Sequence, residues 1–312
     1  MKKPNLETQI GRIKFKNPVL AASGTFGYAR EFEKLTDLRR LGGIVTKTLT
    51  LKPRLGNAPT RIVETPSGML NAIGLQNVGA ERFIGEKLPY LRKLGVPIVA
   101  SVMGYSVEEF VSVVEVLDSA KGIDGFELNL SCPNVSYGSR SKDGGVRMFA
   151  HEERLVAQVV RAVRKTTGKT VIAKLGPDVS DIGKMARAAE DAGADAVSLI
   201  NTLVAMVIDV KKRRPVLANK TGGLSGPCIR PIAVRMVWEA AQRVSIPVIG
   251  IGGIMNAHDA LEFLIAGASA IQVGTAGFVN PNACVEILEG IKRFMLDEKI
   301  RSAAELVGIL NA

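Results

Sequence analysis

A cysteine directly follows a predicted β-strand. Residues 126–134 read Phe-Glu-Leu-Asn-Leu-Ser-Cys-Pro-Asn, and apolar residues alternate with polar ones until Pro133. This alternation is typical of a strand, and proline ends it. The thiol of Cys132 is therefore predicted at the carboxyl end of a strand, between the amides of Asn129 and Asn134. Free cysteines are usually buried apolar residues, but one in this position is a candidate catalytic group.

Lysines end two other predicted strands. Lys47 follows the apolar segment 44–46, and Lys174 follows 171–173. A lysine at a strand end can extend its alkyl chain and bring its ammonium group to solvent. The presence of two such lysines, on different strands, instead favours a role in an active site. There they would stabilise a developing anion, or one would form a Schiff base.

Glycine-rich turns follow the last two predicted strands. Residues 250–254 read Gly-Ile-Gly-Gly-Ile, and Gly274-Thr275 follows the next apolar segment. Glycine also serves tight packing between a strand and a helix. In a (β/α)8 barrel, however, the loops after strands seven and eight bind phosphate through backbone N–H groups. These turns therefore predict a phosphorylated ligand or cofactor.

Eight short apolar segments alternate with helical segments, as in repeated βα units. Residues 192–197 and 266–271 are near copies, each of which ends a helix at glycine and begins a strand. Eight units predict an α/β fold, a closed (β/α)8 TIM barrel formed by residues 1–312 as a single domain. The predicted strands are residues 19–22, 43–48, 98–102, 125–129, 171–175, 196–200, 248–251 and 270–273.

Other elements are expected around this barrel. The apolar spacing predicts helices at residues 107–117, 152–166, 182–192, 230–243, 256–265 and 282–295, and a short one at 302–309. An N-terminal β-hairpin of residues 6–10 and 12–15 would close the bottom of the barrel. Long rim loops are expected at 49–80 and 133–151, where they would shape a site or form a lid.

The composition excludes several classes of protein. The three cysteines are far apart and the two histidines lack a partner at ligand spacing, so neither a disulfide framework nor a metal site is expected. The net charge of +11 includes a basic run at 211–214, but the other cations are spread over predicted helices, which favours a solvated surface over nucleic-acid binding. Without an 18-residue apolar run or a signal peptide, we expect a cytoplasmic protein that does not bind membranes.

The predicted strand ends combine lysines, amides, hydroxyls and a thiol, without a carboxylate or a histidine. With a phosphate site, this set is consistent with two chemistries. One is an aldolase-type reaction of a lysine nucleophile with a sugar phosphate. The other is flavin chemistry, in which the phosphate belongs to FMN, a lysine stabilises the reduced flavin and the thiol moves a proton.

Motifs along essentially the whole chain resemble those of the dihydroorotate dehydrogenases, the FMN enzymes of pyrimidine biosynthesis. They are residues 22–28, Lys47-Thr48, 53–59, 71–75, 129–134, Asn201-Thr202 and 250–253. The resemblance implies a barrel that holds FMN at its mouth and oxidises dihydroorotate to orotate. It also implies that Cys132 is the catalytic base, which removes the C5 proton as C6 delivers a hydride to flavin N5.

The resemblance also implies which residues bind. The substrate would be held by Lys47, Asn71, Ala72, Ile73, Gly74, Leu75, Asn129, Asn201 and Thr202. FMN would be held by Ser23, Lys47, Thr48, Ser101, Asn129, Lys174, Ile200, Gly226, Gly252, Gly253, Gly274 and Thr275. Two features depart from the family pattern: Ser101 replaces the usual asparagine, and the segment 137–152 is longer and more basic.

Within the family, a cysteine base and the lack of an N-terminal membrane helix resemble the soluble class 1 enzymes. Residues 23–28 and 53–59 are most similar to class 1B, the NAD-linked form. This implies a homodimer in a heterotetramer with an electron-transfer subunit that carries FAD and a 2Fe-2S cluster, since three isolated cysteines cannot hold such a cluster. The alternatives are a fumarate-linked class 1A enzyme and an FMN-dependent tRNA dihydrouridine synthase. The net charge favours the synthase, but the chain has no room for an RNA-binding domain.

Overall fold

The computed structural model describes residues 3–131 and 149–311. Eight parallel strands form a closed barrel, which confirms the predicted (β/α)8 fold. Around the barrel the order is β10, β15, β16, β3, β4, β7, β8 and β9. In chain order these strands are β3 (Val19–Ala21), β4 (Gly43–Val45), β7 (Ile98–Val102), β8 (Gly125–Asn129), β9 (Thr170–Lys174), β10 (Ala196–Leu199), β15 (Val248–Ile251) and β16 (Ala268–Val273).

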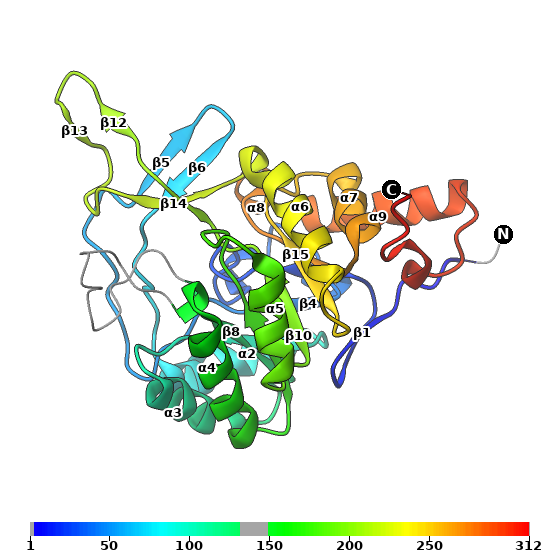
Figure 1. Cartoon of the computed structure of the whole chain (residues 1–312), viewed down its shortest axis with the longest axis horizontal. Helices are drawn as coiled ribbons and strands as arrows, with labels where there is room; N and C mark the ends of the chain where they lie inside the picture. Colours follow the sequence, from blue (N-terminus) through cyan, green and yellow to red (C-terminus); the bar gives the residue numbers. More distant parts are fainter. Residues whose placement is uncertain (1–2, 132–148, 312) are drawn as a thin grey trace.

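Helices lie along the outside of the barrel (Figure 1). The larger ones are α3 (Val107–Asp118), α4 (Glu153–Thr166), α5 (Ile182–Asp191), α6 (Arg230–Ala241), α7 (Ala257–Ala266) and α9 (Ala283–Asp297), each within two residues of the prediction. Asp181 and Asn256 cap α5 and α7, because their side chains accept the N–H groups of Lys184 and Asp259. A helical stretch of α1 (Ala80–Arg82), η3 (Phe83–Lys87) and α2 (Leu88–Arg92) precedes β7.

Short helical turns complete the set: η1 (Arg30–Phe32), η2 (Leu38–Arg40), η4 (Phe149–His151), η5 (Pro227–Ile229), α8 (Ala276–Val279) and η6 (Ala303–Leu306). The predicted C-terminal helix over 302–309 is wrong in extent, because only the 3-10 turn η6 forms there. No helix in residues 3–131 and 149–311 has the length and apolar character needed to cross a membrane.

The predicted N-terminal hairpin is confirmed as β1 (Thr8–Ile10) paired with β2 (Ile13–Phe15). Its buried side chains Ile10, Ile13 and Phe15 pack in one cluster with barrel residues such as Val45 and Ile172. The hairpin therefore closes the amino end of the barrel, and this leaves the carboxyl end of the strands for a site.

A second sheet, which the sequence did not predict, covers the carboxyl rim. It contains β5 (Ile62–Thr65), β6 (Gly68–Asn71), β11 (Leu203–Ala205) and β14 (Gly222–Ser225), in the order β11, β14, β6, β5. Strands β12 (Ile208–Asp209) and β13 (Arg214–Pro215) form a hairpin that projects beyond it (Figure 1). The region 49–80, expected to be a rim loop, therefore contains the strands β5 and β6. The sequence does not reveal them, because they are short, their alternation is weak and β6 pairs with the distant strand β14.

Candidate active site

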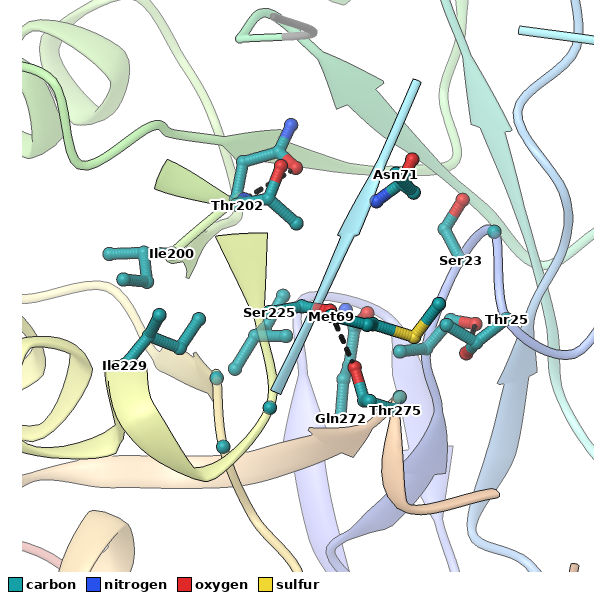
Figure 2. Close-up of a pocket in the computed structure, with 18 of the residues that line it drawn as sticks. Ser23, Thr25, Met69, Asn71, Ile200, Thr202, Ser225, Ile229, Gln272 and Thr275 are labelled. Carbon is teal, nitrogen blue, oxygen red and sulfur yellow. Dashed lines mark hydrogen bonds between the residues drawn. The ribbon is translucent and has the colours of Figure 1, made fainter. Parts of the chain in front are cut away.

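A cavity of about 260 Å³ lies at the carboxyl ends of the barrel strands, below the rim sheet. Figure 2 shows polar and apolar side chains from both sheets around it. Most predicted site residues line it: Ser23, Lys47, Thr48, Asn71, Ile73, Gly74, Leu75, Asn129, Lys174, Ile200, Asn201, Thr202, Gly226, Gly252, Gly253, Gly274 and Thr275. The structure thus brings together residues that are more than 200 positions apart in the sequence.

One part of the cavity wall consists of the glycine loops after β15 and β16. Within residues 3–131 and 149–311, the backbone N–H groups of Gly253, Ile254, Gly274 and Thr275 donate no hydrogen bond. Thr275 Oγ1 donates to Ser225 Oγ at 2.8 Å and ties the rim sheet to this wall (Figure 2). Unpaired N–H groups on adjacent loops form a site for an anion such as phosphate.

Gly253 in this wall must be a glycine. Its φ is +71°, and a Cβ atom there would lie 2.8 Å from the carbonyl oxygen of Gly226 and 2.9 Å from the backbone nitrogen of Arg230. Gly226, with φ +100°, is similarly close to the backbone of Gly68. At both positions the backbone therefore lies against neighbouring backbone, where a side chain does not fit.

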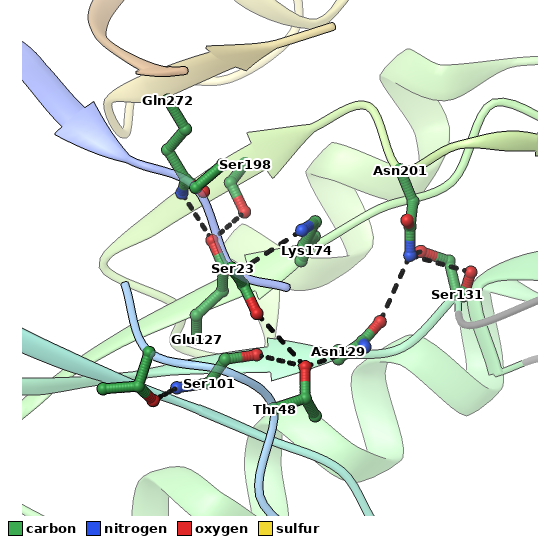
Figure 3. A network of polar contacts seen from close by, with 12 residues as sticks. Ser23, Thr48, Ser101, Glu127, Asn129, Ser131, Lys174, Ser198, Asn201 and Gln272 are labelled. Atoms are coloured by element: carbon green, nitrogen blue, oxygen red, sulfur yellow. Dashed lines mark hydrogen bonds and ion pairs between the residues drawn. The ribbon is translucent and has the colours of Figure 1, made fainter. Parts of the chain in front are cut away.

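Hydroxyl groups are linked beside Asn129. Thr48 Oγ1 lies 2.9 Å from Ser101 Oγ and 3.2 Å from Ser23 Oγ, and it accepts a hydrogen bond from Asn129 Nδ2 at 3.3 Å (Figure 3). Ser101 is fully buried and does not line the cavity. The structure therefore places Ser101 behind Thr48, not at the surface where a direct flavin contact was predicted.

Ala72 also lies outside the cavity wall, although its neighbours in the motif 71–75 line it. Its side chain is buried in a small cluster with Leu70 and Leu217. The alternation along β6 explains the difference, since Asn71 and Ala72 point to opposite faces.

Asn201 joins the exits of β8 and β10. Its Nδ2 donates to the carbonyl oxygen of Ser131 at 3.0 Å, to Ser131 Oγ at 3.1 Å and to Asn129 Oδ1 at 3.2 Å (Figure 3). Its Oδ1 accepts the backbone N–H of Thr202 at 2.9 Å. The predicted neighbours Asn129 and Asn201 are therefore held in one fixed arrangement of amides.

A buried carboxylate, Glu127, lies beneath the cavity wall, where the sequence predicted none. Its Oε2 accepts hydrogen bonds from Ser198 Oγ at 2.9 Å and Gln272 Nε2 at 2.6 Å, and its Oε1 lies 3.7 Å from Lys174 Nζ (Figure 3). The alternation could have revealed it, because Glu127 and Asn129 share one face of β8. Four further residues that line the cavity were not predicted from the sequence: Met69, Ser225, Gln272 and Phe278.

Cys132, the predicted base, lies outside the described residues, as do Asn134 and most of the basic segment 137–152. The residue before it, Ser131, is the one that Asn201 holds. Neither described cysteine lines the cavity. Cys228 is exposed, and burial in α9 raises the pKa of the Cys284 thiol to about 12.

Comparison with known proteins identifies the family. The sequence model of the family Dihydroorotate dehydrogenase matches residues 5–295. A protein of Trichlorobacter lovleyi is 53% identical over 309 residues, 99% of both chains, and one of Geotalea daltonii is 52% identical over 311 residues, 100% of both chains. A third, from Thermodesulfovibrio yellowstonii, is 53% identical over 305 residues, 98% of both chains. All three are named dihydroorotate dehydrogenase B (NAD(+)), catalytic subunit. This chain belongs to the dihydroorotate dehydrogenase family.

Proposed function

We propose that this chain oxidises dihydroorotate to orotate in pyrimidine biosynthesis, as an FMN-dependent barrel and the catalytic subunit of a class 1B enzyme. The observation that carries the proposal is one cavity with two kinds of wall. The loops after β15 and β16 line it with backbone N–H groups that have no acceptor within residues 3–131 and 149–311, and fixed amides line it at the ends of β8 and β10. The relatives named above support the activity and the class.

The residues present fit FMN. The N–H groups of Gly253, Ile254, Gly274 and Thr275 suit its phosphate, because they have no acceptor in the described part of the protein. Lys174, with a side chain 8% exposed, provides a buried cation in the cavity wall. Ile200, Ile229 and Ile254 give that wall apolar area against which a planar ring can pack. When bound, FMN supplies the two-electron acceptor that these side chains lack.

The remaining polar groups suit dihydroorotate, a ring of amides with a carboxylate. Asn71, Asn129 and Asn201 offer donors and acceptors for the ring amides, and the ammonium group of Lys47 pairs with the carboxylate. In our proposal Cys132 would remove the C5 proton of the substrate, and the amides would orient the substrate ring so that C6 could give up its hydride. Lys174 stabilises the negative charge that develops on the cofactor.

The names of the relatives support NAD as the electron acceptor. These relatives are catalytic subunits of NAD(+)-linked enzymes, so we propose that this chain, as a homodimer, passes its electrons to NAD through a separate subunit carrying FAD and a 2Fe-2S cluster.

The purified chain with FMN is expected to be yellow and to lose that colour when dihydroorotate is added without oxygen.

Turnover assays test the class. With dihydroorotate, we expect no NAD reduction by the chain alone and clear NAD reduction once a cell extract containing the second subunit is added; extract without the chain is the control. Turnover with fumarate by the chain alone would instead place it in class 1A. A protein that stays colourless after FMN is offered contradicts the flavin proposal altogether.

The Asn201→Leu variant is expected to bind orotate about tenfold or more weakly, because a buried polar group that loses its partner costs about 1–3 kcal/mol. Leucine has a similar size but cannot hold Asn129 or offer an amide to the ligand. Orotate titration followed by the flavin absorbance measures the dissociation constant. Asn219→Leu, at an exposed residue outside the cavity, is the matched control. Equal affinity in the two variants contradicts the assignment of Asn201 to the substrate.

A further inference from the structure

The ion pair between Glu127 and Lys174 lies against the proposed flavin site, with one charge in the wall and the other behind it. Lys174 lines the cavity, whereas Glu127 does not line it and is 0% exposed. The 3.7 Å between Lys174 Nζ and Glu127 Oε1 is too long for a hydrogen bond but close enough for strong Coulomb attraction in a buried place. The two groups therefore act on the cavity through their charges.

The carboxylate is fixed independently of the lysine. Ser198 from β10 and Gln272 from β16 both donate to Oε2, while Oε1, the oxygen near Lys174, has no hydrogen-bond donor in the described part of the chain. Lys174 in turn has no other ion-pair partner among residues 3–131 and 149–311. The position of the negative charge is thus set by three strands of the barrel.

The cavity wall itself is cationic. Lys47 and Lys174 line it, and no aspartate or glutamate does so within residues 3–131 and 149–311. A cation beside a flavin stabilises its reduced, anionic form and so raises its reduction potential. A negative charge directly behind that cation reduces this rise in the reduction potential, since Coulomb energies fall only slowly with distance in a buried site.

We propose that Glu127 is a positioning and tuning residue, which offsets the charge of Lys174 and keeps the bound flavin a strong electron donor. The inference rests on the proposed function. It accounts for a buried carboxylate that does not line the cavity but lies next to a lysine that does. A flavin of lower potential passes electrons more readily to a weak oxidant, which suits a family branch whose members are named for NAD(+).

Sulfite binding to the oxidised protein tests the inference without turnover. Sulfite adds to flavin N5 through its sulfur lone pair, and the displaced electron pair leaves a negative charge on the flavin pyrimidine ring that a nearby cation stabilises. The Glu127→Gln variant has the same shape and is expected to bind sulfite about tenfold more tightly, because it loses the offsetting charge. The Lys174→Met variant is expected to bind it about tenfold more weakly.

If the Glu127→Gln variant does not fold, the same sulfite titration can be made with the double variant Glu127→Gln/Lys174→Met. It contains no unpaired buried charge, and it is expected to bind sulfite more tightly than Lys174→Met alone. Asp195→Asn is the matched control, because Asp195 pairs with Arg164 at the amino end of the barrel, away from the cavity. This variant is expected to bind sulfite with unchanged affinity. The inference is overturned if Glu127→Gln binds sulfite no more tightly than the unaltered protein, or if the double variant binds it no more tightly than Lys174→Met. A protein that binds no flavin overturns the proposed function instead.

Discussion

The Cys132→Ala variant is expected to reduce its flavin with dihydroorotate about 10²- to 10⁴-fold more slowly than the unaltered protein, the usual contribution of a general base. The thiol is the proposed acceptor of the C5 proton, and alanine cannot accept one. Fixed amides at Asn129 and Asn201 remain in this variant, so orotate should still bind. Stopped-flow absorbance under anaerobic conditions measures the reduction, and an orotate titration measures the binding.

The rate should also depend on pH. An ordinary cysteine thiol has a pKa of about 8.5, so the active thiolate is scarce at neutral pH and flavin reduction should accelerate as the pH rises toward that value. Cys228→Ala is the matched control, since Cys228 is exposed and does not line the cavity. A reduction rate that is flat with pH, or an alanine variant at position 132 with the full rate, would remove Cys132 from its proposed role.

The barrel could be predicted because its signals are local. The near-copies at 192–197 and 266–271 are confirmed: α5 and α7 end just before Gly193 and Gly267, which have φ of +96° and +122°, and β10 and β16 begin shortly afterwards. A helix that ends at glycine before an apolar segment needs no information from the rest of the chain. The rim sheet could not be predicted in this way, because β6 and β14 are more than 150 residues apart.

The site shows the same division. Residues in glycine turns and at strand ends, such as Gly253 and Lys174, were assigned to the cavity from their motifs and do line it. Ala72 was assigned by its position in the motif 71–75, and Ser101 because it stands where the family commonly has an asparagine, but neither lines the cavity. Glu127 was missed because a buried charge is defined by partners on other strands, here Ser198 and Gln272, which only the closed barrel brings near.

Substitution of Gly253 by alanine is expected to weaken FMN binding about a hundredfold and to lower the melting temperature of the flavin-free protein, because a strained backbone residue costs about 1–3 kcal/mol. The new Cβ would lie 2.8 Å from the Gly226 carbonyl oxygen, at a φ of +71° that alanine rarely adopts.

Relief of this contact requires the loop after β15 to move, which displaces the backbone N–H groups of the cavity wall that have no acceptor in the described part of the chain. FMN affinity, measured by fluorescence quenching, reports on the cradle, and the melting temperature with and without FMN separates lost binding from lost folding. Gly277→Ala is the matched control, since its nearest neighbour would be a ring atom of Phe32 at 3.9 Å and the residue is helical. This control should bind FMN normally. Normal affinity in the Gly253 variant as well would mean that the phosphate is held elsewhere.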